Sequence, residues 1–160
     1  MILVLLGTFM VDFSRPLVAI EKIVQSREID NNFIVQAGHT KFRSSVLEIR
    51  TFIEPSELDD LYVKAELIIT HAGVGSILKG IRMRKKIIAI PRLSKYSEHV
   101  DDHQLDILNE FENRGYLIPW KENDNIATLI ENAKLFVPQP FVSNRQDLEQ
   151  YLIDYIEKLP

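Results

Sequence analysis

The 160-residue sequence contains no cysteine, which excludes disulfide bonds and thiolate-bound metals and favours a reducing, cytoplasmic setting. It also lacks any apolar run near the roughly 20 residues that a membrane-crossing helix needs. The apolar start, Met1 to Leu6, has no basic flank, so it predicts a first strand rather than a signal peptide. An excess of positive charge is missing too, because the net charge of −4 argues against a general nucleic-acid binder.

What remains is the composition of a soluble globular protein, with 46% hydrophobic and 26% charged residues. A chain of this length fits one domain with a sizeable core. Apolar runs without alternation, such as Ile2–Leu6, are typical of parallel strands buried on both faces. The expected strands are Ile2–Leu6, Phe33–Val35, Val46–Phe52, Leu67–Thr70, Ile87–Ile90 and Leu117–Ile118.

Amphipathic segments separate these strands and predict helices. Ser14 and Ser56 are the expected N-caps of two of them, and a third is expected from about His99 to Asn113, closed by Gly115. Alternation of strands and helices predicts an α/β fold, a mostly parallel sheet with helices on both faces. The remaining helices are expected around Ile126–Ala133 and, after a loop from Phe136 to Ser143, at about residues 144–158.

The segment from His71 to Ser76 reads as the end of a buried strand, a glycine turn and the start of a helix. Unpaired N–H groups at a helix N-terminus carry partial positive charge and suit a phosphate. Glycines at Gly73 and Gly75 let a ligand approach the backbone closely. The alternative is a plain strand-to-helix connection in which the glycines serve only the turn.

Other polar motifs also follow predicted strands, at Gly7-Thr8, Gln36-Ala37-Gly38 and Pro91 onward. Ligands of parallel α/β sheets bind at the carboxyl ends of the strands, so this convergence predicts a nucleotide-type ligand. A dinucleotide fold is not expected, because Gly73-x-Gly75 lacks the third glycine and follows the fourth strand instead of the first.

The second polar segment runs from Pro91 to Gln104 and leaves three interpretations open. His99 and His103, one helical turn apart and next to Asp102, could bind zinc. The segment could instead be a solvated helix start whose acidic residues complement the helix dipole. In a third interpretation Asp102, His103 and Gln104 form hydrogen bonds to sugar hydroxyl groups.

In their order along the chain, these motifs resemble the donor-binding C-terminal half of GT-B glycosyltransferases of the MurG kind. The resemblance is greatest to the stand-alone small subunit of two-part enzymes, such as PssE-type subunits of capsule and exopolysaccharide synthesis and the dolichol-pathway N-acetylglucosaminyltransferase. It implies a Rossmann-like sheet of about six strands, a single GT-B half-domain that binds a nucleotide sugar over residues 1–160. The motifs are Leu3–Thr8, Phe13-Ser14-Arg15, Val35–Thr40, His71–Leu78, Pro91-Arg92-Leu93 and Glu98–Gln104.

The resemblance also implies roles for individual residues. Gly7 and Thr8 border the diphosphate, and Gly73, Gly75 and Ser76 contact the phosphates at the helix N-terminus. His71 is the implied catalytic residue, which stabilises the leaving UDP as charge builds on its β-phosphate. Donor-sugar hydroxyls are met by Asp102, His103 and Gln104, and the loop from Gln36 to His39 borders the base. No metal and no cofactor are implied.

One position departs from the family pattern. Relatives usually carry a glutamate that accepts hydrogen bonds from both ribose hydroxyls, and here that position is Lys79. Lysine has only donors, so it cannot accept from the ribose. The basic run from Arg82 to Lys86 is expected to be a solvated helix end, with contact to an anionic lipid or diphosphate as the alternative.

A GT-B enzyme needs two domains that face each other across a cleft, and the resemblance covers one. It implies an inverting transfer from a UDP-sugar to a lipid-linked saccharide in polysaccharide biosynthesis, completed by a membrane-anchored, acceptor-binding subunit. This chain would then be peripheral at the cytoplasmic membrane face, with the terminal helix as a docking candidate. The alternative is a non-catalytic subunit that stabilises its partner and has weakened nucleotide binding.

Overall fold

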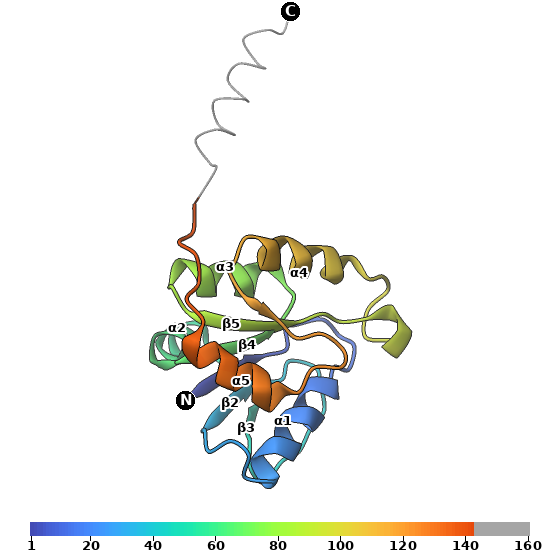
Figure 1. Ribbon diagram of the computed structural model, residues 1–160. Helices are drawn as coiled ribbons and strands as arrows, with labels where there is room; N and C mark the ends of the chain where they lie inside the picture. The colour runs from blue at the N-terminus through green and yellow to red at the C-terminus, as the bar shows by residue number, and fades with distance from the viewer. Residues whose placement is uncertain (143–160) are drawn as a thin grey trace, which may run out of the picture.

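The computed structural model of the chain describes residues 1–142, which form a sheet covered by helices on both sides (Figure 1). All six strands are parallel and lie in the order β3-β2-β1-β4-β5-β6. The strands are β1 (Ile2–Leu5), β2 (Phe33–Gln36), β3 (Glu48–Arg50), β4 (Leu67–His71), β5 (Lys86–Ile90) and β6 (Ile118–Pro119). The helices are α1 (Arg15–Gln25), α2 (Pro55–Lys64), α3 (Val74–Arg82), α4 (His103–Asn113) and α5 (Ile126–Leu135), with a 3₁₀ turn η1 (Ser94–Tyr96).

Strand β1 lies at the centre, paired with β2 on one side and β4 on the other. All four of its residues are buried, as the continuous apolar run predicts for a strand covered on both faces. The chain builds β1 to β3 toward one edge of the sheet and then β4 to β6 toward the other. The order therefore reverses between β1 and β4, which is the position where doubly wound sheets bind ligands.

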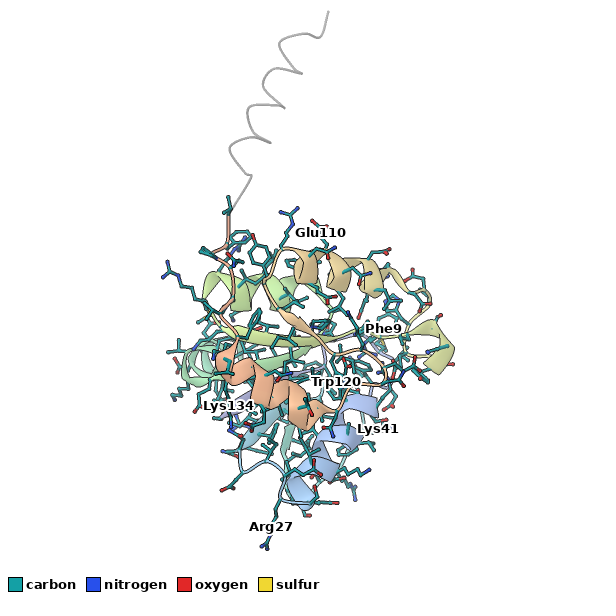
Figure 2. The ribbon with its side chains drawn as sticks, viewed as in Figure 1. Phe9, Arg27, Lys41, Glu110, Trp120 and Lys134 are labelled. Atoms are coloured by element: carbon teal, nitrogen blue, oxygen red, sulfur yellow. The ribbon has the colours of Figure 1, made fainter. Side chains whose placement is uncertain are left out.

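The two faces of the sheet carry separate parts of the core. Helices α1 and α5 cover one face and α2, α3 and α4 the other (Figure 1). Alternate residues of β1 divide between them, since Ile2 and Val4 pack toward α1 while Leu3 and Leu5 pack toward α2. Trp120, the single tryptophan, is buried between the sheet and α5 (Figure 2). The predicted parallel sheet with helices on both faces is confirmed.

Of two predicted helix caps, Ser14 is confirmed in position but makes no capping bond, and Ser56 is wrong. Ser14 stands at the N-cap position of α1, but its hydroxyl donates to Asp12 Oδ2 at 2.7 Å and makes no capping bond. Helix α2 begins at Pro55 with Glu54 as its N-cap, so Ser56 lies inside the first turn. Proline at the first helical position has a suitable fixed φ and needs no N–H partner. The helix therefore begins earlier in the sequence than predicted.

Helix α4 is shorter than predicted because it begins at His103 instead of His99. The carboxylate of Asp101 accepts the backbone N–H of His103 at 3.2 Å, which satisfies an N–H group in the first turn. The predicted end is confirmed, with Gly115 at a φ of 69° just after Arg114. Strand β3 is also shorter than Val46–Phe52, and the expected helix at about residues 144–158 lies outside the described residues.

Within residues 1–142, none of the helices has the length and apolar character that crossing a bilayer requires.

Candidate functional site

A pocket of about 250 Å³ opens at the carboxyl ends of β1, β2 and β4, at the reversal of strand order. Topology brings its walls together from distant parts of the sequence, as the convergence of polar motifs predicts. It is lined by Leu5, Gly7, Thr8, Gln36, His71, Gly73, Gly75 and Ser76.

His71 is the last residue of β4 and forms one wall of this pocket. Its Nδ1 lies 3.4 Å from the carbonyl oxygen of Leu5 on the neighbouring strand. Because a carbonyl oxygen only accepts, that bond needs the proton on Nδ1 and leaves the lone pair of the neutral ring on Nε2. Burial lowers the pKa of His71, and the positive charge of Arg92 lowers it further. The imidazole is therefore held neutral in the free protein at pH 7.

Two glycines leave room for the imidazole ring. A β-carbon on Gly7 would lie 2.7 Å from ring atoms of His71, and one on Gly73 would lie 2.1 Å from Nε2. Gly7 also has a φ of 79°, a conformation that other residues rarely adopt. These glycines serve the packing of His71, so they are required even before a ligand binds.

Gly75 is different, because a β-carbon there would meet no described atom within 4 Å. It lies in the first turn of α3, beside Ser76, where backbone N–H groups have no helical partner. Open space beside unpaired N–H groups is the arrangement that binds phosphate at helix N-termini. The hydroxyl of Tyr62 on α2 donates to the carbonyl oxygen of Ser76 at 3.3 Å and ties this turn to the next helix.

Arg92, just after β5, belongs to one of the motifs that carry the resemblance, but the sequence predicts no role for its side chain. Its side chain is 1% exposed and donates to the carbonyl oxygens of Leu6 at 3.0 Å, Val11 at 2.9 Å and Glu98 at 3.2 Å. Among residues 1–142 its Nε has no hydrogen-bond partner. Arginine side chains usually lie at the surface, so its burial could be suspected only from the motif Pro91-Arg92-Leu93 and its place directly after a buried strand.

Glu98, the partner of this network, is also buried. Its carboxylate accepts from Arg15 at 2.7 and 2.8 Å and from the backbone N–H of Leu93 at 3.1 Å. Arg15 and Arg92 thereby connect α1, the loop after β1 and the segment before α4.

The three residues expected at the donor sugar point in different directions. Gln104 is buried, and its Oε1 accepts the backbone N–H of Arg92 at 3.0 Å. Asp102 is exposed, and its Oδ1 accepts from Ser94 at 2.7 Å. His103 is exposed and pairs with Asp101. Asp102 also lines a second pocket of about 370 Å³, bordered by Arg15, Pro91 and Trp120, so the three do not converge on one point.

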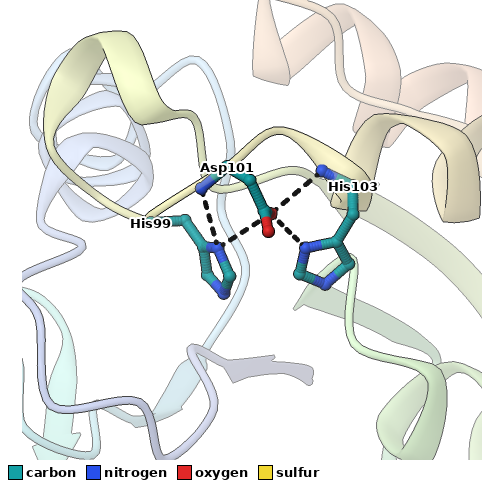
Figure 3. Close-up of side chains that lie close together, drawn as sticks. All are labelled: His99, Asp101 and His103. Carbon is teal, nitrogen blue, oxygen red and sulfur yellow. Dashed lines mark hydrogen bonds and ion pairs between the residues drawn. The ribbon is translucent and has the colours of Figure 1, made fainter.

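His99, Asp101 and His103 form a cluster at the start of α4 (Figure 3). Nδ1 of His99 lies 3.2 Å from Oδ1 of Asp101, and Nδ1 of His103 pairs with the same oxygen. Hydrogen bonds from His103 lower the pKa of the Asp101 carboxyl. The sequence predicts Asp102 as the carboxylate of this group, and that is wrong because Asp102 turns toward Ser94.

Lys79, on α3, contacts two residues of the neighbouring helix α2. Its ammonium pairs with the carboxylate of Asp59 on α2 and lies 4.4 Å from the centre of the Tyr62 ring. Burial raises the pKa of Tyr62 to about 12, so the ring stays neutral beneath the ammonium. The residue that departs from the family pattern therefore bridges two helices.

The basic run after α3 makes specific contacts. Lys85 Nζ donates to the carbonyl oxygens of Val63 at 2.6 Å and Ala65 at 2.9 Å. Lys86 Nζ reaches the carbonyl of Lys134 on α5. Lys85 therefore complements the negative C-terminal end of α2, and not that of α3, the helix that the basic run follows.

A family model described as the glycosyltransferase family 28 C-terminal domain matches residues 1–150. The UDP-N-acetylglucosamine transferase subunit ALG13 of Candida albicans is 34% identical over 99 residues, which are 61% of this chain and 32% of that protein. A UDP-N-acetylglucosamine–N-acetylmuramyl-(pentapeptide) pyrophosphoryl-undecaprenol N-acetylglucosamine transferase of Clostridium botulinum is 32% identical over 107 residues, 67% of this chain and 26% of that one. The alignments thus span about a third or less of each relative.

Two solved structures share the fold. The NMR solution structure of ALG13 has a TM-score of 0.56 and 20% identity, covering 98% of this chain and 96% of that one. The crystal structure of Acinetobacter baumannii MurG has a TM-score of 0.59 and 19% identity, covering 98% of this chain and 49% of that one.

Proposed function

This chain belongs to the glycosyltransferase family 28 C-terminal domains, and from that premise we propose that it is the donor-binding subunit of a two-part inverting glycosyltransferase. The enzyme would transfer a sugar from a UDP-sugar to a lipid-linked saccharide in polysaccharide biosynthesis. The observation that carries the proposal is the pocket in which His71 meets the open N-terminus of α3 at the reversal of strand order.

The donor diphosphate lies, in this proposal, against Gly75 and Ser76. Their position in the first turn of α3 supplies unpaired N–H groups, and the missing side chain of Gly75 lets phosphate oxygens approach. Gly7 and Thr8 border the same pocket from β1. The base extends toward the loop from Gln36 to His39, beside an open cavity of about 640 Å³.

His71 acts on the leaving group. Its Nδ1–H donates to the carbonyl oxygen of Leu5, so Nε2 carries a proton for a phosphate oxygen only when the ring is doubly protonated. A nearby phosphate anion stabilises the protonated imidazole, and this stabilisation increases as negative charge builds on the departing UDP. His71 therefore stabilises the transition state more than the bound donor.

Donor-sugar recognition is assigned to the segment Asp102-His103-Gln104. With Oε1 of Gln104 held by Arg92, the amide Nε2 is the group of Gln104 left to meet a sugar hydroxyl. Asp102 and His103 are exposed at the same end of the sheet. This part of the proposal needs the segment to close over the bound donor.

The partner subunit completes the reaction. It would be membrane-anchored, bind the lipid-linked saccharide and deprotonate the acceptor hydroxyl, while this chain stays peripheral at the cytoplasmic face. Support comes from the relative that is named as a UDP-N-acetylglucosamine transferase subunit. The helix expected at about residues 144–158 is the proposed docking element.

A second candidate, a stabilising subunit with little donor affinity, is favoured by one observation. The ammonium of Lys79, at the position where the family resemblance places the ribose-binding glutamate, is already paired with Asp59. Calorimetric titration with UDP, with and without magnesium and after chelation, decides between the two. Metal-independent binding supports the donor-binding subunit, and no heat at millimolar UDP supports the stabilising one.

A further inference from the structure

We propose that His99, Asp101 and His103 bind one divalent transition-metal ion of the zinc class. Each residue offers one ligand atom, and these atoms lie within 4.8 Å of one another. In Figure 3 both Nδ1 atoms face the carboxylate of Asp101. Four-coordinate zinc, with bonds of roughly 2.0–2.1 Å, places its ligand atoms roughly 3.3 Å apart. Small side-chain rotations are therefore enough to close the three groups around an ion.

The surrounding structure holds the ligands in place before an ion arrives. The His99 side chain is 13% exposed, and its ring stacks on Phe9 with 4.8 Å between centroids. The Asp101 carboxylate is fixed by the backbone N–H of His103, which its Oδ1 accepts at 3.2 Å. A ligand set whose rotamers are already restricted loses little entropy on binding.

The chemistry of the set selects the ion. Two imidazoles and one carboxylate suit zinc and its neighbours, whereas magnesium prefers oxygen ligands. The nearby carboxylates are engaged elsewhere, Glu98 with Arg15 and Asp102 with the backbone of Ser94. Asp101 and His103 are about half exposed, so water can take the remaining coordination position. The bound ion would fasten the segment before α4 to the loop after β1 through the stack of His99 on Phe9.

The test uses the full chain, with any affinity tag removed and treated with a chelator. Zinc, cobalt and magnesium are titrated by calorimetry, and cobalt is also followed by visible absorption. We expect one zinc or cobalt per chain, a cobalt spectrum of low coordination number, and no comparable magnesium binding. His99→Ala and His103→Ala should each weaken zinc binding by more than the roughly 10–100-fold typical for loss of an outer partner.

Controls separate the site from incidental binding. Asp101→Asn keeps the size of the side chain and removes its charge, so it should weaken zinc without unfolding the loop. His39→Ala removes a histidine of another loop and should leave zinc binding unchanged. Circular dichroism confirms that each variant is folded. Zinc binding that is absent, or equal in His99→Ala, His103→Ala and the original chain, would overturn the proposal.

The metal site does not rest on the proposed function. His99→Ala should lose zinc and keep UDP binding, because His99 does not line the phosphate pocket. Zinc binding without UDP binding would leave the metal site standing and refute the donor site. UDP binding without zinc binding would do the reverse.

Discussion

Nε2 of His71 lies 2.1 Å from the point that a β-carbon on Gly73 would occupy. The imidazole thus fills the space in which any other residue would carry its side chain. A β-carbon on Gly7 would lie 2.7 Å from atoms of the same ring. The imidazole can occupy this position only because residues 7 and 73 have no side chains, and any larger residue at either position would displace it.

Gly73→Ala and Gly75→Ala should therefore have opposite effects. Gly73→Ala displaces His71 and should lower the melting temperature, since backbone and ring cannot both stay in place. Gly75→Ala meets no described atom and lies in a helix, so it should raise stability by up to about 1 kcal/mol. It should nevertheless weaken UDP binding, because its methyl group blocks the approach of phosphate. Thermal unfolding and calorimetry measure both, and unchanged UDP affinity in Gly75→Ala would remove this turn from the site.

The free energy of unfolding should decrease as the pH is lowered, because of His71. Its pKa is lowered in the folded protein by burial, whereas the unfolded chain has a pKa near about 6.5. Below that pH the unfolded state binds more protons, so the free energy of unfolding decreases as the pH falls through the folded pKa. Above about pH 7.5 His71 is neutral in both states and no stability is lost. Below that pH the free energy of unfolding falls by at most about 1.4 kcal/mol per pH unit. Urea unfolding from pH 8 to 5 should show a steeper loss in the original chain than in His71→Gln, and equal slopes would contradict the burial argument.

The isolated chain should transfer no sugar to a lipid-linked acceptor. In the complex with the proposed membrane partner, His71→Ala should lower turnover on the order of 10²–10³, as loss of an oxyanion-hole donor does. Donor affinity should change less, since charge on the leaving phosphate grows toward the transition state. Steady-state kinetics with separate values of kcat and KM test this. Robust transfer by the chain alone would refute the two-part enzyme, and a fully active His71→Ala complex would exclude this residue from the chemistry.

Lys79→Glu should strengthen UDP binding if residue 79 occupies the ribose position. A carboxylate that accepts from the ribose hydroxyls contributes about 1.5–3 kcal/mol at best. Asp59 now pairs with Lys79, so the new glutamate would face a like charge. The double variant Lys79→Glu/Asp59→Asn removes that repulsion and should bind UDP more tightly than the single variant. Weaker or unchanged binding in both would mean that another residue holds the ribose.

Gln104 should have two separable roles. Gln104→Ala leaves the buried N–H of Arg92 without its acceptor and should cost about 1–3 kcal/mol of stability. Gln104→Glu keeps an acceptor for Arg92 but removes the amide donor, so it should fold well and discriminate less between donor sugars. Thermal unfolding and donor competition in the reconstituted enzyme distinguish the roles. Unaltered sugar preference in the folded Gln104→Glu complex would restrict this residue to support of Arg92.

The central strands are predictable because burial on both faces requires continuous apolar runs. Ile2–Leu5 and Leu67–His71 stand out for that reason. Strand β3 is predicted too long, since its alternating pattern continues beyond the residues that pair at the sheet edge. Helix starts are less predictable. Pro55 and Asp101 determine two of them, while nearby polar residues offer equally good caps.

The position of the pocket beside His71 is predictable because parallel strands bring their carboxyl ends to one edge of the sheet. That geometry places Gly7, Gln36 and His71 together without any knowledge of side-chain packing. Arg92 and Asp101 are not predictable in this way. Their roles depend on which way a loop turns, and a one-residue difference between Asp101 and Asp102 decides which carboxylate meets the histidines.

The guanidinium of Arg92 joins the carbonyl groups of Leu6 and Glu98, from two segments that are far apart in sequence. Neither the loop after β1 nor the segment before α4 can detach without exposing the same buried charge. Local unfolding of this edge should therefore be cooperative, with both segments opening in one event. In hydrogen–deuterium exchange the amides of Arg92 and Leu93, which donate to Gln104 and Glu98, would become labelled together with those of the β1 loop. A ligand that touches either segment would slow exchange in both.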